Sequence, residues 1–309
     1  MPKFLVIDAN ALLHRSFHAL PALTTKKGEP TGAVYGFLLT FFKALNDIKP
    51  DFVVATFDTP APTFRHKQFK EYKAKRPKVP EELTVQIPKI KEVLRVFNIP
   101  IFEKEGFEAD DLIATIVKKI SEKKRYPGLE IYILTGDFDT LQLVDKNTKV
   151  YTLGRGVKET VIYDREKVRE RFKIKPSQIP DFKALAGDPS DNIPGVPGIG
   201  EKTAAQLIEK FGSLENLYKE IEKEKDVKPK IKKSLLQNKE QAFFSRILAK
   251  TREDVPIDFE IEKCQFGRFD EEKVKSVLKR FEFYTLIKRL PEIRKKEEKI
   301  PSGKDLRLF

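Results

Sequence analysis

The chain has 309 residues, of which 40% are apolar and a single one is cysteine. This length suffices for one large or two ordinary domains, and the apolar content excludes a disordered polymer. Because Cys264 is alone, an intrachain disulfide framework and a cysteine-rich zinc site are excluded. A net charge of +13, from 60 Lys and Arg against 47 Asp and Glu, favours a polyanionic partner such as nucleic acid. A solvated Lys/Glu-rich surface of the thermophilic kind would give the same surplus.

The first half of the chain alternates short apolar runs with helical patterns. The apolar runs are residues 4–7, 52–57 and 131–134, each too short for an independent helix but suited to a buried parallel strand. The helical patterns are residues 32–45, 85–96 and 109–120. This alternation predicts an α/β fold with a mostly parallel sheet flanked by helices. Residues 149–153 and 160–163 add a predicted hairpin, joined at Gly154-Arg155-Gly156.

After about residue 164 the strand pattern fades, and short helical patterns follow, separated by Pro and Gly. They cover residues 165–172, 177–185, 201–211, 214–221 and 240–249, and a longer amphipathic pattern covers 272–290. From Pro291 the pattern is lost. We therefore predict an α/β core over residues 1–175, a helical module over 176–290 and a mobile tail over 291–309.

Aspartates follow three of the predicted strands. Asp8 follows the first, Asp58 the second, and Asp137 and Asp139 the third. In an open parallel sheet the functional crevice lies beyond the carboxyl ends of the strands, so these carboxylates should converge. Each one alone is equally consistent with an ordinary turn residue.

Two more acidic groups follow along the chain. Glu108, Asp110 and Asp111 open the helix predicted from residue 109, and Asp188 and Asp191 lie in the sequence GDPSDN. Acidic residues in a first helical turn commonly cap the helix and complement its dipole. If all nine carboxylates gather in one crevice, their repulsion requires protonation, Lys or Arg partners, or divalent cations. Such oxygen ligands select Mg²⁺ or Mn²⁺, and two ions about 4 Å apart would activate water and stabilise the leaving oxygen of a phosphodiester.

The segment from residue 60 to 80 is strongly basic. Seven basic residues stand against one acidic residue, Glu71. The basic residues are Arg65, Lys67, Lys70, Lys73, Lys75, Arg76 and Lys78. Phe64, Phe69 and Tyr72 are interleaved with them, and positive charge with aromatic faces suits single-stranded nucleic acid. A solvated surface helix would carry a more even balance of charge.

A glycine- and proline-rich loop at residues 193–204 (IPGVPGIGEKTA) is the most specific local pattern. Closely spaced glycines let the backbone approach phosphate, and the helix starting near Glu201 points its amides at the same place. An ATP-binding P-loop is the rival interpretation, since Gly195 and Gly200 have its separation. Glu201 intervenes before Lys202-Thr203, however, and no long apolar strand leads in, so we reject the P-loop.

These motifs occur in the order and spacing of one family. They are residues 6–10 (VIDAN), 56–58 (TFD), 106–111 (GFEADD), 135–139 (TGDFD) and 187–192 (GDPSDN). Over about residues 3–290 the chain resembles the 5′ nuclease domain of bacterial DNA polymerase I, within the flap endonuclease family. The resemblance implies a PIN-like nuclease core, a helical arch over residues 60–85 and a helix-hairpin-helix loop over 193–204. Asn10 and Phe138 depart from the family pattern without replacing a carboxylate.

The resemblance also implies roles for individual residues. The more tightly held metal site would use Asp8, Asp58, Glu108, Asp110 and Asp111. The second site would be supported by Asp137, Asp139, Asp188 and Asp191. Lys73 and Arg76 match positions that contact the scissile or terminal phosphate, and the loop carbonyls would hold K⁺. The expected DNA contacts are Arg15, Arg65, Gly195, Gly198, Gly200, Lys202, Thr203 and Tyr72, the last by stacking on an unpaired base.

The chain ends in Leu-Arg-Leu-Phe. The stretch from Asp305 to Phe309 is similar to the short peptide by which bacterial replication proteins dock on the sliding clamp, although Asp305 stands where Gln is usual. The alternative is the start of a linker, or the point where a longer polymerase was divided. A sliding clamp and a fused or separate DNA polymerase are therefore expected partners.

The sequence thus predicts a structure-specific 5′ nuclease, a 5′-3′ exonuclease and flap endonuclease of replication and repair. It would hydrolyse DNA at flaps, nicks and RNA–DNA primer junctions with two or more Mg²⁺ ions, for which Mn²⁺ can substitute. Two alternatives stay open: a metal-dependent ribonuclease, which has no evident need for the 193–204 loop, and a catalytically inert structure-specific DNA-binding module, which should have lost carboxylates. No apolar run reaches the length of a membrane span and no signal peptide is found, so we expect a cytoplasmic, nucleoid-associated protein.

Overall fold

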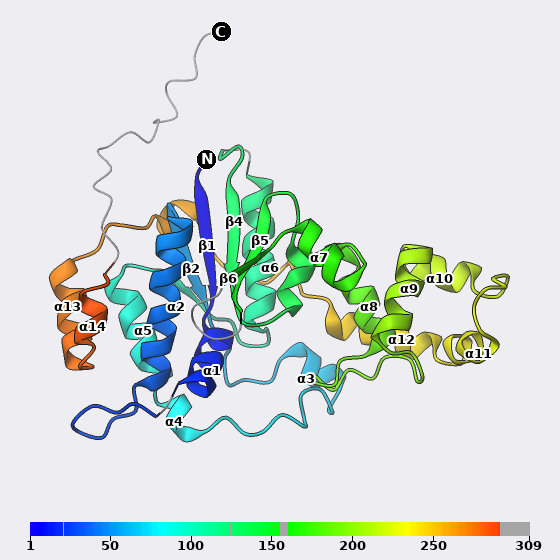
Figure 1. Ribbon diagram of the computed structural model, residues 1–309, viewed down its shortest axis with the longest axis horizontal. Coiled ribbons are helices and arrows are strands. Elements are labelled where there is room, and N and C mark those ends of the chain that lie inside the picture. The colour runs from blue at the N-terminus through cyan, green and yellow to red at the C-terminus, as the bar shows by residue number, and fades with distance from the viewer. Residues whose placement is uncertain (21, 124, 155–159, 291–309) are drawn as a thin grey trace, which may run out of the picture.

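A six-stranded sheet forms the centre of the computed structural model, which describes residues 1–20, 22–123, 125–154 and 160–290 (Figure 1). Its strands are β1 (Lys3–Asp8), β2 (Phe52–Thr56), β3 (Ile101–Phe102), β4 (Glu130–Leu134), β5 (Thr148–Leu153) and β6 (Thr160–Tyr163), in the order β3-β2-β1-β4-β5-β6. All neighbouring strands are parallel except β5 and β6, which are antiparallel. The predicted mostly parallel sheet and its hairpin are confirmed, while residues 155–159 of the hairpin turn lie outside the described residues.

Helices cover both faces of the sheet because its strands carry apolar side chains on each. Leu5 and Ile7 of β1 lie in one core layer, and Phe4 and Val6 lie in the other. The first layer is closed by α1 (Ala9–Ala19), α2 (Gly32–Ile48) and α5 (Ile87–Val96). The second is closed by α6 (Ala109–Glu122) and continues into the helical module. Both α1 and α6 begin on the side of the sheet where the carboxyl ends of the parallel strands lie (Figure 1).

The basic segment leaves the carboxyl end of β2 and runs past this same edge (Figure 1). We call residues 60–80 the arch segment. It contains one short helix, α3 (Phe64–Gln68), then turns at residues 70–76 and an extended stretch that leads to α4 (Glu81–Thr84). The sequence predicted a helical arch, but Pro77 and Pro80 disfavour helix in the second part of the segment.

The second half of the chain is helical, as predicted. Its elements are α7 (Arg165–Phe172), η2 (Pro176–Gln178), α8 (Ile179–Ala186), α9 (Glu201–Phe211), α10 (Leu214–Glu220), α11 (Pro229–Gln237), α12 (Lys239–Ala249) and η3 (Ile261–Cys264). Helix α8 packs against α9 and α12, and α9 to α11 project beyond the sheet (Figure 1). Helix α11 was not predicted.

The last described helices return to the sheet. The single helix predicted over residues 272–290 is divided into α13 (Glu271–Arg280) and α14 (Tyr284–Ile287) near Glu282, whose φ of 61° is incompatible with a continuing helix. Helix α13 packs on α5 and shares its core, so by packing it belongs with the sheet rather than with the helical module. No helix in the described part of the chain is long and apolar enough to cross a membrane. The predicted tail, residues 291–309, lies outside the described residues.

Candidate metal centre

Asp8 occupies the last position of β1 and caps the first turn of α1. Its carboxylate accepts hydrogen bonds from the backbone amide of Ala11 at 3.0 Å and from the Thr135 hydroxyl at 2.6 Å. The side chain is buried, and burial raises the pKa of Asp8 to about 7. Asp58 and Asp137 add to this rise because their negative charges lie nearby. A buried carboxylate among like charges is a natural cation ligand.

Two carboxylates after β2 and in α6, Asp58 and Asp110, lie near Asp8, and Glu108 lies near Asp58. Asp58 follows β2 and accepts a hydrogen bond from the backbone amide of Ala109 at 2.7 Å, which ties it to the start of α6. Burial raises the pKa of Asp58, and nearby Glu108 contributes. Asp110, in the first turn of α6, has a pKa well above its usual range through burial and through the charges of Asp137, Asp8 and Asp139.

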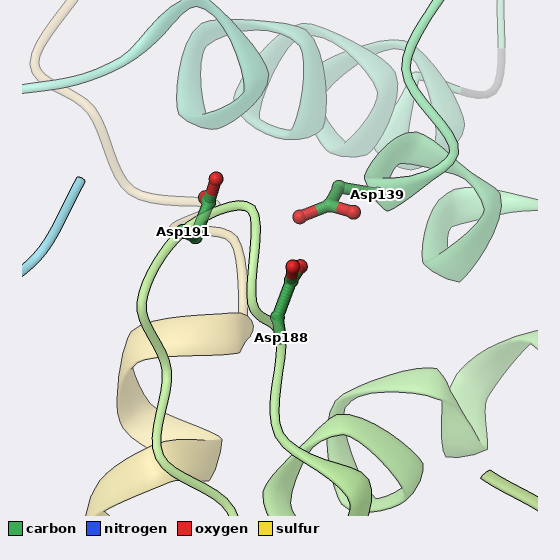
Figure 2. A group of neighbouring side chains, drawn as sticks. All are labelled: Asp139, Asp188 and Asp191. Atoms are coloured by element: carbon green, nitrogen blue, oxygen red, sulfur yellow. The ribbon is translucent and has the colours of Figure 1, made fainter. Parts of the chain in front are cut away.

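A second group of carboxylates lies beside the first. Asp139 begins η1 (Asp139–Leu143), whereas Asp188 and Asp191 come from the loop between α8 and α9. Oxygen atoms of these three residues lie within 4.8 Å of one another, and Figure 2 shows the three side chains converging. Asp137 connects the groups, because its carboxylate accepts a hydrogen bond from the Asp139 amide and its charge acts on Asp8 and Asp110.

This set of side chains fits divalent cations. All of the donors are hard carboxylate oxygens, which are the ligands Mg²⁺ and Mn²⁺ prefer. Burial also raises the pKa of Asp139 to about 7, although Lys183 opposes the change. Burial, and to a smaller extent mutual repulsion, disfavours the charged form of these carboxylates, and a bound cation would favour it again.

Three basic side chains already offset part of this charge. Lys183 of α8 pairs with Asp139 and, at 2.6 Å, with Asp188. Burial disfavours the charged form of Asp188, but Lys183 and Ser190 outweigh it and lower its pKa. Lys73 and Arg76 of the arch segment pair with Glu108 and Asp191.

These contacts place the two predicted phosphate-binding residues directly at the metal centre. The Lys73 ammonium lies 2.9 Å from Glu108 and 3.7 Å from Asp191, and Arg76 pairs with Asp191. Sequence reasoning missed Lys183, which has a similar role. Its signal was its place as the single basic residue of α8, five positions before Asp188.

Two residues with predicted ligand contacts, Asp111 and Arg65, bind each other inside the protein. Asp111 is 0% exposed and Arg65 is 2% exposed, and their side chains form a bidentate pair at 2.8 and 2.9 Å. Neither side chain faces solvent, and the roles of Asp111 as a metal ligand and of Arg65 as a DNA contact stay predictions. The charge of each is neutralised by the other, which removes the reason to seek an outside partner.

Tyr72 and Phe69, aromatic residues of the arch segment, pack against other parts of the protein. Tyr72 is 3% exposed, and its hydroxyl donates to Glu108 at 3.1 Å and to Asp191 at 3.0 Å. Phe69 packs edge-on against Phe244 of α12. In this conformation Tyr72 therefore has no free face for a base, contrary to the sequence expectation, and it instead orients two carboxylates of the metal centre.

The glycine-rich loop is joined to the second carboxylate group. Asp188 and Ile193 exchange both backbone hydrogen bonds, so the loop begins where that group ends. Gly195 is buried, with its amide bonded to Ser245 and its carbonyl to Gln241, and a side chain there would collide with the backbone of Gly187. Gly195 is therefore a packing residue in this structure, and its contact with DNA stays a prediction.

The rest of the loop is placed as a contact surface requires. Gly198, Gly200 and Lys202 are exposed and Thr203 is half-buried at the start of α9. No side chain caps this helix, whose first amides point outward from Gly200. Arg15, also predicted to touch phosphate, donates to the carbonyls of Leu153 and Gly154 and so braces the end of β5.

A mostly parallel sheet with carboxylates gathered beyond its strand ends, joined to a helical module with an exposed glycine loop, defines a metal-dependent nuclease. Residues 3–173 match the family model of the 5′-3′ exonuclease N-terminal resolvase-like domain, and residues 174–272 match that of the 5′-3′ exonuclease C-terminal SAM fold. The chain belongs to the 5′-3′ exonuclease family.

Relatives of known name agree with this membership. The chain is 39% identical to a 5′-3′ exonuclease of Aquifex aeolicus, over 95% of this chain and 96% of that protein. It is 43% identical to DNA polymerase I of Caldicellulosiruptor bescii and 40% identical to that of Bacillus subtilis, over 93% and 98% of this chain. The chain spans about a third of the length of these polymerases, namely 33% and 34%.

Solved structures share the fold at low sequence identity. The flap endonuclease of bacteriophage T5, in a complex with DNA and metal ions, superposes with a TM-score of 0.64 at 21% identity, over 91% of this chain and 99% of that one. The catalytic core of Rad2 with DNA substrate gives a TM-score of 0.62 at 19% identity, over 92% and 88%. These neighbours establish the shared fold.

Proposed function

We propose that the chain is a structure-specific 5′ nuclease that cuts DNA at 5′ flaps, nicks and RNA–DNA primer junctions, leaving a 3′-hydroxyl and a 5′-phosphate. The observation that carries the proposal is the continuity of the carboxylate centre with the exposed loop. Asp188 and Asp191 lie in the same turn that leads, through the Asp188–Ile193 backbone pair, into residues 193–204. A duplex held at the loop therefore delivers its end to the carboxylates.

Two cation positions would be formed by this chain's own carboxylates. Asp8, Asp58, Glu108 and Asp110 surround the first, and Asp137, Asp139, Asp188 and Asp191 the second. Two bound Mg²⁺ ions would supply an activated water and would neutralise charge that develops on the phosphodiester, with Mn²⁺ able to replace them. Asp8 and Asp58 are held in place for this by the amides of Ala11 and Ala109.

Lys73 and Arg76 would hold the phosphate. In the free protein they pair with Glu108 and Asp191, so cations entering the centre would release them from these carboxylates. A released ammonium and guanidinium then bind the scissile or terminal phosphate and stabilise its negative charge. A pocket of about 470 Å³ between the arch segment and the loop, lined by Phe69, Lys75 and Asp188 among others, offers the strand a path.

The duplex side of the junction would lie on the loop and α9. Gly198 and Gly200 allow close approach of the DNA backbone, and Lys202 and Thr203 add charge and a hydroxyl. Backbone carbonyls of the same loop are the site we propose for K⁺. None of these groups reads base edges, so selectivity rests on the shape of the junction.

The relatives named DNA polymerase I suggest a setting in replication and repair within the nucleoid, with a polymerase fused to this chain or acting beside it. Docking of residues 305–309 on a sliding clamp stays a prediction, because these residues lie outside the described part of the chain. Deleting Asp305 to Phe309 and measuring clamp binding tests it, and unchanged binding would remove the idea.

The proposed activity is tested by cleavage of a 5′-labelled flap duplex. We expect junction-specific cuts in Mg²⁺, none in EDTA and none by Asp58→Ala, whereas the exposed control Asp258→Ala should cut normally. Flap binding without cleavage in any divalent metal would leave an inert DNA-binding module. Equal cleavage of unbranched RNA would point to a ribonuclease.

A further inference from the structure

We propose that Arg65 and Asp111 form a positioning clasp, which fixes the metal ligand Glu108 and joins three elements, and which binds neither metal nor DNA itself. The proposal concerns the same centre as the proposed function and rests on it for the role of Glu108. The two clasp residues lie in α3, at the base of the arch segment, and in the first turn of α6.

Asp111 has no lone pair left for a cation. One carboxylate oxygen accepts from Arg65 at 2.9 Å and from the backbone amide of Arg252 at 2.8 Å. The other accepts from Arg65 at 2.8 Å and from the backbone amide of Glu108 at 3.1 Å. A carboxylate offers about four lone-pair sites, and four donors occupy them here. A metal ion could bind only by displacing a buried, charge-assisted contact.

Arg65, for its part, has no N–H left for a phosphate. Its Nε donates to the carbonyl of Leu248 at 2.8 Å. One terminal nitrogen donates to Asp111 and, at 3.2 Å, to Glu108, and the other donates to Asp111 and, at 3.0 Å, to the carbonyl of Lys250. A guanidinium has five N–H donors, and all five are engaged.

These bonds give the clasp its function. One oxygen of Glu108 accepts from Arg65 and Tyr72, which leaves the other oxygen directed at Lys73 in the free protein and available to a cation. Holding a ligand through its second oxygen fixes its orientation, as outer partners of metal ligands commonly do. A loose Glu108 would have to lose rotamer freedom on every binding event.

The clasp also connects the metal centre to the duplex-binding loop. Leu248 and Lys250 lie at the carboxyl-terminal end of α12, whose unpaired carbonyls Arg65 caps. Farther along α12, Ser245 and Gln241 bond to Gly195 of the loop. The arch segment, α6 and the helical module therefore meet at one arginine, and its geometry sets the distance from the held duplex to Glu108.

Asp110 provides a matched comparison one residue away. It faces Asp8, Asp137 and Asp139 rather than an arginine. The isosteric changes Asp110→Asn and Asp111→Asn should therefore act in opposite directions on the metal-free protein. Loss of a repelled charge at 110 should raise the melting temperature in EDTA, and loss of the partner of a buried arginine at 111 should lower it.

Mn²⁺ binding, followed by electron paramagnetic resonance, supplies the second readout. Asp110→Asn should lose one bound Mn²⁺, whereas Asp111→Asn should keep the wild-type number and bind them more weakly, by about tenfold, through a looser Glu108. If Asp111→Asn raises the melting temperature in EDTA and loses a Mn²⁺, Asp111 is a ligand and the clasp is refuted. If even the wild type binds no Mn²⁺, the proposed function fails, while the melting temperatures still decide the clasp.

Arg65→Gln tests the other half of the pair. We expect a lower melting temperature but an unchanged slope of flap-DNA affinity against salt concentration, measured in EDTA. The control Lys202→Gln should keep its stability and reduce that slope by about one unit, as a lost phosphate contact does. A reduced slope for Arg65→Gln with unchanged stability would show a DNA contact and overturn the proposal.

Discussion

Two groups of carboxylates in this molecule manage their charge in different ways. The strand-end group, Asp8, Asp58 and Asp110, lies next to the sheet, and burial raises all three pKa values. The loop group, Asp139, Asp188 and Asp191, faces Lys183 and Arg76, which offset its charge. Burial also raises the pKa of Asp139, but its ion pair with Lys183 opposes the change, whereas no ion pair is formed by Asp8, Asp58 or Asp110 among the described residues. The first group thus depends more on a bound cation than the second. We infer that the first holds its cation tightly and the second exchanges it.

The largest expected effect separates the two groups directly. Asp8→Asn should lower the single-turnover rate of flap cleavage about 10³-fold, the several kcal/mol of charge stabilisation that a bound metal supplies, with no recovery at high Mg²⁺. Asp188→Asn should lower the same rate about 10- to 100-fold. The rate should recover in part as the Mg²⁺ concentration is raised, because the cation at this site competes with Lys183. A Mg²⁺ titration of both variants measures this. Equal losses with equal recovery would erase the distinction.

Removing a basic side chain of the arch segment should have opposite effects on flap cleavage and on Mn²⁺ binding. Arg76→Ala should slow flap cleavage about 10²-fold, since a donor to the developing charge is lost. The same change frees Asp191 and should tighten Mn²⁺ binding in the absence of DNA. Lys146→Ala, outside the arch segment and the loop, is the control, because Lys146 is exposed and pairs with no carboxylate among the described residues. Weaker Mn²⁺ binding by Arg76→Ala would contradict the interpretation that Arg76 offsets the charge of Asp191.

Lys183→Met addresses the internal cation of the loop group. Two half-buried carboxylates lose their partner, so the free energy of unfolding in EDTA should fall by about 2–3 kcal/mol, less than for a fully buried pair because Asp139 can take up a proton. Saturating Mg²⁺ should remove most of the deficit by replacing the lost charge. Chemical denaturation with and without Mg²⁺ measures both values. The control Lys149→Met, which breaks a more exposed pair with Glu130, should cost about 1 kcal/mol or less in either condition.

The contrast between the groups also marks how far sequence reasoning reaches. The α/β order, the aspartates at strand ends and the loop at 193–204 follow from local patterns, because strand ends and helix starts are encoded within a few neighbouring residues. Asp110 and Asp111 share one motif, and nothing local separates their roles. Their difference lies in Arg65 and Arg252, which are 46 and 141 residues from Asp111 along the chain. Such partners are fixed by tertiary packing alone.

The arch segment also shows what sequence reasoning can and cannot predict. Its seven basic residues, against a single acidic residue, predicted a nucleic-acid contact. Lys73 and Arg76 do lie at the metal centre. Composition could not show that Arg65 and Tyr72 turn inward, because both find acidic partners on α6 and in the loop after α8. A buried polar group needs those partners, and only the fold supplies them.

The smallest expected effect is the pH dependence of the metal-free protein. Burial places the pKa of Asp8 and of Asp139 at about 7 in the folded chain, above the usual 3.8. Between these values the folded state holds more protons than the unfolded state, so the free energy of unfolding falls as pH rises. The contribution of protonated Asp8 and Asp139 to the free energy of unfolding is fully present below pH about 4 and is lost as pH rises through about 7. In EDTA the melting temperature should therefore drop between pH 5 and pH 8, less steeply in Asp8→Asn, and Mg²⁺ should raise it more at pH 8. A melting temperature that rises over this interval, with the same slope in Asp8→Asn, would mean that charging Asp8 and Asp139 does not destabilise the metal-free protein.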